Sequence, residues 1–126
     1  MRYKLLGKSG LRVSELCLGG MTFGEDWGSM LPGASKEEAR KIFDLFVSKG
    51  GNFIDTANVY QNGTSEKYVG EFISSERERF VVATRYTMTT NPDDPNASGK
   101  ITENTSFLML CNVSIIAGKH SGNYTN

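Results

Sequence analysis

The chain has 126 residues, with 14 basic and 14 acidic side chains and therefore no formal net charge. A chain of this length forms one ordinary domain, and its balanced charge excludes a main function in binding nucleic acids or anionic membranes. Hydrophobic residues make up 38% of the sequence and aromatic residues 10%, which is typical of a globular core and excludes a disordered chain. Residues 1–8 lack the apolar run of a signal peptide, and the longest apolar run, residues 107–117, is too short to cross a bilayer.

Cysteine and histidine usage indicates a cytoplasmic protein without a metal site. The two cysteines, Cys17 and Cys111, lie far apart in the sequence, and we expect both thiols to be buried and reduced. The lone histidine, His120, has no cysteine or histidine cluster beside it, so the sequence does not predict a zinc site.

The first expected element is a β-hairpin with arms at residues 3–7 and 11–16. Residues 8–10, Lys-Ser-Gly, supply the turn between the arms. The second arm continues into the apolar run 16–20, which predicts a buried strand ending in two glycines. Glycine at a strand end allows the close approach of a ligand or of another backbone segment.

Residues 21–34 predict a long glycine-containing loop. Loops of this length inside a compact domain are usually functional. Phe23 and Trp27 of this loop either line a pocket for an apolar substrate or pack the loop onto the body of the domain, and the sequence leaves both interpretations open.

Residues 35–51 carry the signals of a complete helix. Ser35 and Glu38 stand at the spacing of a capping box, and the paired glycines 50–51 supply a stop. The apolar residues between these signals recur at helical spacing: Ala39, Ile42, Phe43, Phe46 and Val47. The sequence therefore predicts an amphipathic helix with one face in the core.

Two further strands and a second helix are expected before residue 87. Residues 52–57 predict a short buried strand, and residues 80–84 predict a strand that ends at Arg85. Between them, Thr64 or Ser65 is expected to cap a helix with a charged exit at 74–79. The apolar face of that helix consists of Val69, Phe72 and Ile73. This alternation predicts an α/β fold with parallel strands and right-handed crossovers.

Beyond Thr87 the character of the sequence changes. Residues 89–99 are rich in Asn, Asp, Pro and Gly, which predicts a loop. Residues 101–126 contain only Glu103 and Lys119 as charged residues and show no capped amphipathic pattern. The sequence indicates no segment that covers a sheet edge, so we expect two open edges, which favour self-association.

Four residues are expected to meet at the carboxyl end of the sheet: Gly20, Asp55 and Arg85 at strand ends, and Tyr60 in the loop after the second strand. Chemistry in parallel α/β folds gathers at this end. Neighbouring strands lie about 4.8 Å apart, so we expect a bidentate ion pair between Asp55 and Arg85. A nearby cation favours phenolate, which makes Tyr60 a candidate for proton transfer.

Each candidate also has an interpretation without catalysis. Asp55 can accept hydrogen bonds from loop amides, Tyr60 can anchor its loop, and Arg85 can pair with a neighbouring surface acid. The sequence contains no sensible Ser-His-Asp arrangement, no Gly-x-Gly-x-x-Gly opening a helix and no phosphate loop. The residues by themselves support an α/β fold with an acid/base site.

Four segments resemble the aldo-keto reductase family. Residues 1–14 resemble its bottom-closing hairpin, and residues 16–24 resemble its first barrel strand and loop, where the family more often has threonine in place of Gly20. Residues 52–60, NFIDTANVY, resemble its most specific motif, and residues 81–86 resemble its third strand. The resemblance covers about residues 1–100.

The resemblance implies a (β/α)₈ barrel that reduces small-molecule carbonyl compounds with NADPH. In this chain it implies that Tyr60 is the general acid that protonates the carbonyl oxygen. It further implies that Asp55 holds the family's lysine position, here Arg85, and that Gly20, Met21 and Asp55 lie near the nicotinamide-ribose end of the cofactor.

The chain departs from the family in two respects. Arg85 replaces a lysine, and because arginine is larger, planar and permanently charged, we expect a large loss of reduction rate. A complete barrel needs about 250 residues, and only the hairpin and the first three β/α units are recognisable. The family's histidine and the phosphate-binding loops after the seventh and eighth strands have no counterpart.

These departures lead to an expected division of the chain. Residues 1–100 are expected to form a partial reductase domain, and residues 101–126 a divergent tail that is read out of frame in a truncated or frame-shifted gene product. Sequencing the gene beyond codon 100 tests that hypothesis. The alternative to a weakened reductase is a catalytically inactive fragment, at most an interaction module.

Overall fold

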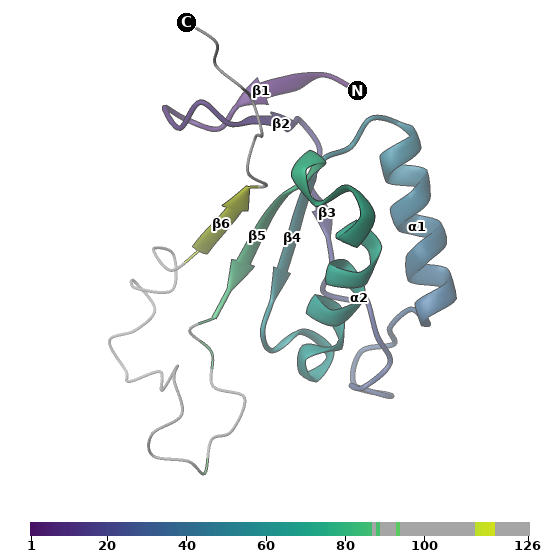
Figure 1. Ribbon diagram of the computed structural model, residues 1–126. Helices are drawn as coiled ribbons and strands as arrows, with labels where there is room; N and C mark the ends of the chain where they lie inside the picture. Colours follow the sequence, from purple (N-terminus) through teal and green to yellow (C-terminus); the bar gives the residue numbers. More distant parts are fainter. Residues whose placement is uncertain (87, 89–92, 94–112, 118–126) are drawn as a thin grey trace, which may run out of the picture.

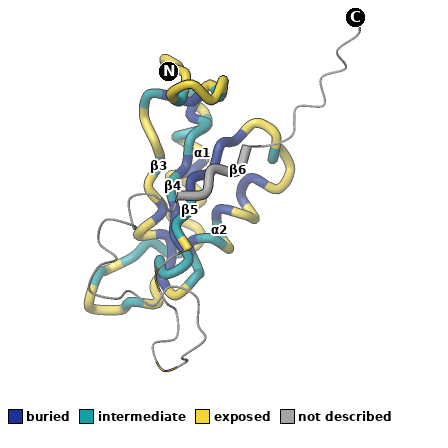
Figure 2. Tube along the Cα trace, turned by 90° about the vertical axis from the view of Figure 1, so that its left-hand side faces the viewer, coloured by how far each residue is buried: buried dark blue, intermediate teal, exposed yellow. Residues whose placement is uncertain are grey.

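The computed structural model describes residues 1–86, 88, 93 and 113–117 of the chain. It begins with the expected hairpin, in which β1 (Tyr3–Leu5) and β2 (Arg12–Ser14) pair antiparallel. The hairpin lies across the amino ends of the parallel strands of the main sheet (Figure 1) and is largely exposed (Figure 2).

The main sheet has the strand order β3-β4-β5-β6. Its strands are β3 (Leu18–Gly19), β4 (Phe53–Ala57), β5 (Val81–Arg85) and β6 (Val113–Ala117). The first three run parallel, as predicted, and β6 pairs antiparallel with β5 at the outer edge (Figure 1). The fold class is confirmed: a hairpin precedes parallel β/α units, and these units do not close a barrel.

The structure corrects two expectations about the edges of this sheet. The strand expected over residues 16–20 is only two residues long, and Leu16, Cys17 and Gly19 are exposed rather than buried. The outer edge of β5 is not open, because the backbone of β6 pairs along it. Such pairing uses only backbone N–H and C=O groups, so it requires no side-chain pattern that would have predicted β6. Cys111 and His120 lie outside the described residues.

Helix α1 (Lys36–Ser48) begins at the predicted capping box. Ser35 Oγ accepts a hydrogen bond from the backbone N–H of Glu38, and Glu38 Oε2 accepts one from the backbone N–H of Ser35. Ala39 and Phe43 are buried against the sheet, while Ile42, expected in the same apolar stripe, is 44% exposed. The buried face of α1 is therefore narrower than its sequence pattern indicated.

Helix α2 (Thr64–Ile73) lies on the same face of the sheet as α1 (Figure 1). The short 3₁₀ segments η1 (Tyr60–Gly63) and η2 (Ser74–Arg79) precede and follow it. The two helices and the sheet share one core, whose buried residues are Phe23, Ala39, Phe43, Ile54, Val69, Phe72, Ile73, Phe80 and Val82. Burial of this core fixes the parallel strands, and their carboxyl ends then carry the candidate site.

The expected cap of α2 was wrong. The N-cap residue is Gly63, with φ 91°, and no side chain caps the helix. Ser65 is instead fully buried, where its Oγ donates a hydrogen bond to the carbonyl oxygen of Gly20 at 2.7 Å. Ser65 Oγ also lies 2.8 Å from Thr56 Oγ1, within hydrogen-bond distance. Ser65 therefore ties α2 to the loop after β3 and to β4.

Candidate active site

Arg85 joins the other two predicted catalytic residues. Its Nη2 donates one hydrogen bond to Asp55 Oδ2 and another to Tyr60 Oη at 2.5 Å. In the sheet register Asp55 lies opposite Ala83, and Arg85 lies opposite Ala57, so the charged pair is diagonal on one face. The structure thus brings Asp55, Tyr60 and Arg85 together.

The expected bidentate ion pair is wrong, because a single guanidinium nitrogen contacts both partners. The reason is the register: Asp55 is the third of the five residues of β4 rather than its last, and Arg85 ends β5. The guanidinium must reach back along the sheet to meet the carboxylate. In doing so it also passes over the Tyr60 ring, with its central carbon 5.1 Å from the ring centroid.

Asp55 occupies a half-buried position. The Asp55 and Arg85 side chains are each 35% exposed. Burial raises the pKa of the Asp55 carboxyl, and the Arg85 charge and hydrogen bond offset that rise only in part. Although Cys17 as a whole is exposed, partial desolvation of its thiol, together with the Asp55 charge, raises the pKa of that thiol to about 11. The carboxylate therefore depends on Arg85 for much of its stabilisation.

Two buried polar atoms at this end of the sheet have no hydrogen-bond partner among the described residues: Arg85 Nε and Asn58 Oδ1. Asn58 follows β4 directly, and its backbone N–H donates to the carbonyl oxygen of Arg85 at 2.9 Å. Buried polar groups are normally satisfied. This end of the sheet thus holds one buried donor and one buried acceptor without a partner among the described residues.

The predicted cofactor residues Gly20 and Met21 follow β3. Gly20 is buried, its N–H donates to the carbonyl oxygen of Asp55 at 2.7 Å, and its own carbonyl accepts from Ser65 and Phe23. A β-carbon at Gly20 would lie 2.8 Å from Ser65 Oγ, which leaves no room for the threonine common in the family without rearrangement. Both polar groups of Gly20 are therefore used inside the protein, whereas the Met21 side chain is 43% exposed.

The two aromatic residues of the 21–34 loop have different surroundings. Phe23 is buried in the core, with its ring 6.3 Å from that of Phe72, so it packs the loop onto the domain. Trp27 is half-buried and meets the Tyr60 ring edge-on at 6.3 Å. The two interpretations left open by the sequence therefore divide between the residues, with Trp27 beside the candidate site.

Gln61 holds this loop in place and was missed from the sequence. Its side chain is fully buried, and its Oε1 accepts a hydrogen bond from the backbone N–H of Trp27 at 3.0 Å. Its Nε2 donates to the carbonyl oxygen of Met21 at 3.4 Å. Gln61 has φ 48°, which is uncommon for a residue with a side chain. The NFIDTANVY segment and this glutamine are contiguous, but glutamine is usually exposed, so its type gave no signal.

No group of three or more His, Cys, Asp or Glu side chains within the described part of the chain is placed to hold a metal ion. No helix in that part is long and apolar enough to cross a membrane.

Comparison with known proteins places these observations in a family. The model of the aldo/keto reductase family matches residues 15–107. An aryl-alcohol dehydrogenase of Pestalotiopsis microspora is 45% identical over 97 residues, which are 75% of this chain and 25% of that protein. Norsolorinic acid reductase B of Dothistroma septosporum is 51% identical over 89 residues, which are 68% of this chain and 23% of that protein.

The holo form of an aldo-keto reductase from Bacillus halodurans superimposes with a TM-score of 0.63 at 30% identity. The match covers 77% of this chain and 30% of that structure. The chain thus spans about a quarter of the length of the two curated relatives and less than a third of the solved structure. The family match, the relatives and the fold agree, and the chain belongs to the aldo/keto reductase family.

Proposed function

We propose that this chain carries the proton-donor part of an NADPH-dependent carbonyl reductase site, with Tyr60 as the general acid. The observation that carries the proposal is the placement of Arg85 Nη2 between Asp55 and Tyr60. Asp55 positions the guanidinium, and the guanidinium positions the phenol. These hydrogen bonds support the roles that the family resemblance implies for the three residues.

The direction of the Arg85–Tyr60 hydrogen bond determines what the phenol can do. A guanidinium only donates, so Tyr60 Oη is the acceptor and its own proton is not consumed in this contact. That proton is available to a carbonyl oxygen at the surface of the site. The cofactor would supply a hydride to the carbonyl carbon when bound. Tyr60 would give its proton to the carbonyl oxygen, and Arg85 would stabilise the phenolate that remains.

The described residues fit the reacting end of the cofactor. Arg85 Nε and Asn58 Oδ1 offer an unused donor and acceptor beside Tyr60, and the half-buried Asp55 and exposed Met21 border the same end. Gly20 contributes shape rather than a contact, because both its polar groups are already paired. We propose Met21, Asp55 and Asn58 as the residues that would hold the nicotinamide-ribose end.

We propose that the carbonyl substrate is aromatic. The name of one curated relative, an aryl-alcohol dehydrogenase, indicates an aromatic substrate for that protein. In this chain the half-buried Trp27 ring stands edge-on to Tyr60 and forms a wall beside the proton donor. An aromatic ring packed against Trp27 would bring its carbonyl group toward Tyr60 Oη.

The test is the oxidation of NADPH by the chain in the presence of an aryl aldehyde. We expect slow turnover, because Arg85 takes the place of the family's lysine. Tyr60→Phe removes the proton donor and should lower the rate by roughly 100-fold. Tyr3→Phe is the matched control, since Tyr3 lies on the hairpin at the opposite end of the strands. Equal rates for Tyr60→Phe and Tyr3→Phe would refute the proposal.

A second candidate function is that of an inactive fragment that acts only as an interaction module. The observation that favours it is the antiparallel β6 at the position where a barrel would continue with a parallel strand. For this candidate function we propose that residues 1–100 form a partial reductase domain and that residues 101–126 are a divergent tail. A titration that follows NADPH fluorescence distinguishes the two: binding at roughly micromolar concentration supports the reductase, and no binding at roughly millimolar protein supports the fragment.

A further inference from the structure

We propose that α1 is the contact surface of a weak two-fold dimer of this chain. The helix has a second, exposed stripe formed by Glu38, Ile42 and Leu45, and the C-cap residue Lys49 extends it. Their spacing of four, three and four residues places the three helical residues on one face, with Lys49 at the end of that face. Each is exposed, and the two apolar members, Ile42 and Leu45, are 44% and 62% exposed.

The stripe is self-complementary when two copies of α1 lie antiparallel. Its midpoint falls between Ile42 and Leu45, so a two-fold axis there places Ile42 against Leu45 of the second copy, and the reverse. The same axis places Glu38 against Lys49 of the second copy. A parallel arrangement would instead set Glu38 against Glu38 and Lys49 against Lys49. Charge complementarity therefore selects a second copy in the antiparallel orientation.

The charges of the stripe are available for this contact, whereas their neighbours on α1 are engaged. Lys41 pairs with Glu37 at 2.6 Å, and Arg40 pairs with Asp44 at 2.9 Å. Lys49 forms no salt bridge within the described residues. The capping box uses Glu38 Oε2 and leaves Oε1 free of hydrogen bonds to described residues. One end of the stripe is thus acidic and the other basic, which also matches the antiparallel helix dipoles.

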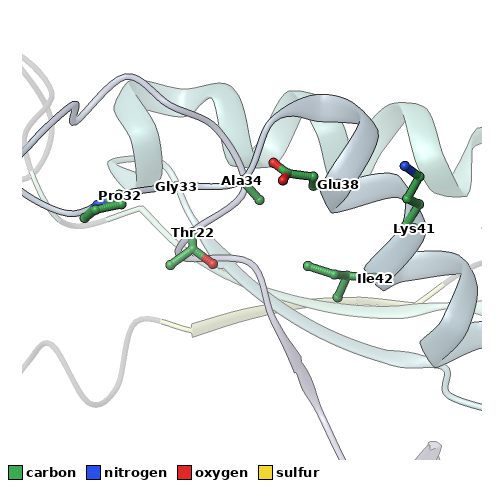
Figure 3. Close-up of a pocket in the computed structure, with 7 residues that line it drawn as sticks. All are labelled: Thr22, Pro32, Gly33, Ala34, Glu38, Lys41 and Ile42. Atoms are coloured by element: carbon green, nitrogen blue, oxygen red, sulfur yellow. The ribbon is translucent and has the colours of Figure 1, made fainter.

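A groove lies beside the acidic half of the stripe. It has a volume of about 520 Å³ and is lined by the 21–34 loop and the first half of α1 (Figure 3). Thr22, Pro32 and Ala34 line the loop side, and Ile42 lines the helix side. In the antiparallel dimer, Leu45 of the second copy meets Ile42 at the border of this groove, so the apolar contact continues onto the loop.

The proposed contact is small, because it rests on one helix and one loop from each copy. Interfaces of this kind lie at the low end of the size range and are weak. We therefore expect a dissociation constant on the order of 0.1 mM. The proposal is independent of the reductase function, because no residue of the stripe belongs to the candidate active site.

Sedimentation equilibrium of the full chain at increasing concentration tests the proposal. We expect a monomer–dimer equilibrium that Leu45→Asp weakens by roughly tenfold or more, since it buries a charge in the apolar centre. Leu5→Asp is the matched control, because Leu5 is 61% exposed but lies on the hairpin. A monomer at all concentrations overturns the proposal. Equal weakening by Leu45→Asp and Leu5→Asp does the same.

A charge-reversal pair tests the orientation. Glu38→Lys and Lys49→Glu each place like charges opposite one another in their own homodimers, so each variant alone should associate more weakly at low salt. Mixing the two variants restores both opposite-charge pairs, and the mixture should form the heterodimer in preference to either homodimer. Circular dichroism verifies that each variant is folded. A mixture no more associated than its folded components overturns the antiparallel arrangement.

Discussion

The two faces of the main sheet carry different tasks. Along β4, Ile54 and Thr56 face the helices, and Ile54 is fully buried in the aromatic core. Asp55, between them, faces the other way and meets Arg85. Alternation along the strand therefore places a core residue and a site residue next to each other. The helix-covered face holds the core, while the opposite face holds the half-buried ion pair of Asp55 and Arg85, to which we assign the proposed reaction.

The largest stability effect expected from this comparison concerns two adjacent residues. Ile54→Ala removes a fully buried side chain and should lower the free energy of unfolding by about 3 kcal/mol. Asp55→Asn, one residue along, preserves shape and should change it by less than about 1 kcal/mol, since the ion pair is partly exposed. Urea denaturation followed by circular dichroism measures both. Similar losses for the two variants would contradict the division of tasks.

The contact of Gly20 with Ser65 joins the loop after β3 to helix α2, which covers the core. Gly20→Ala introduces a β-carbon 2.8 Å from Ser65 Oγ and should cost roughly 1–3 kcal/mol. Ser65→Ala leaves the buried Gly20 carbonyl and Thr56 hydroxyl with fewer partners and should cost about 1–2 kcal/mol. Because the second substitution relieves the clash of the first, the double variant should lose less than the sum. Strict additivity in the unfolding measurements would refute this contact.

A smaller effect concerns the helix that covers the core face. Ser35→Ala removes the N-cap of α1 and should lower the free energy of unfolding by about 1 kcal/mol. Ser48→Ala, in the exposed last turn of the same helix, should stay within about 0.5 kcal/mol of the parent chain. Thermal unfolding of both variants makes the comparison. The prediction fails if the two serines prove equivalent.

The smallest expected effect is a change of stability with pH, and it has opposite signs for Glu38 at the start of α1 and Asp55 on β4. The pKa of Glu38 is lowered by its hydrogen bonds to Ser35, so its contribution is present above the ordinary carboxyl pKa and is lost as pH falls through the lowered value. The pKa of Asp55 is raised by burial, so the native state binds the proton more tightly and stability declines as pH rises from the ordinary value through the raised one.

Neutral variants isolate each contribution across the acidic range. As pH rises, the free energy of unfolding of the parent chain should fall relative to that of Asp55→Asn. Over the same rise in pH, it should increase relative to that of Glu38→Gln. Urea denaturation at several acidic pH values measures both differences. Two differences of the same sign would show that at least one of the two pKa shifts has been assigned the wrong direction.

The sequence predicted the main elements of the helix-covered face. The Ser35 capping box and the apolar spacing predicted α1, and strand–helix alternation predicted the parallel order of β3, β4 and β5. These signals are local, so a single segment carries each of them. The antiparallel β6 was not predicted, because an edge pairing is made by backbone groups and leaves no required side-chain pattern.

The sequence predicted which residues form the candidate site but not how they contact one another. Asp55, Tyr60 and Arg85 were predicted to meet, and they do, but the sheet register makes their contact diagonal and reduces the ion pair to one nitrogen. Gln61 and Ser65 escaped prediction because their burial depends on segments more than 30 residues away in sequence, at Trp27 and Gly20. Such contacts follow from the tertiary structure and have no local signature.

The most direct test of the central claim is the effect of Arg85→Lys on the rate of NADPH-dependent reduction of an aryl aldehyde. Restoring the family's residue should raise the rate by about tenfold, because a lysine at this position stabilises the Tyr60 phenolate without the larger planar group. The gain should vanish in the Tyr60→Phe background, since Arg85 acts through Tyr60. No gain in the parent chain, or the same gain with and without the phenol, would contradict the proposed roles of both residues.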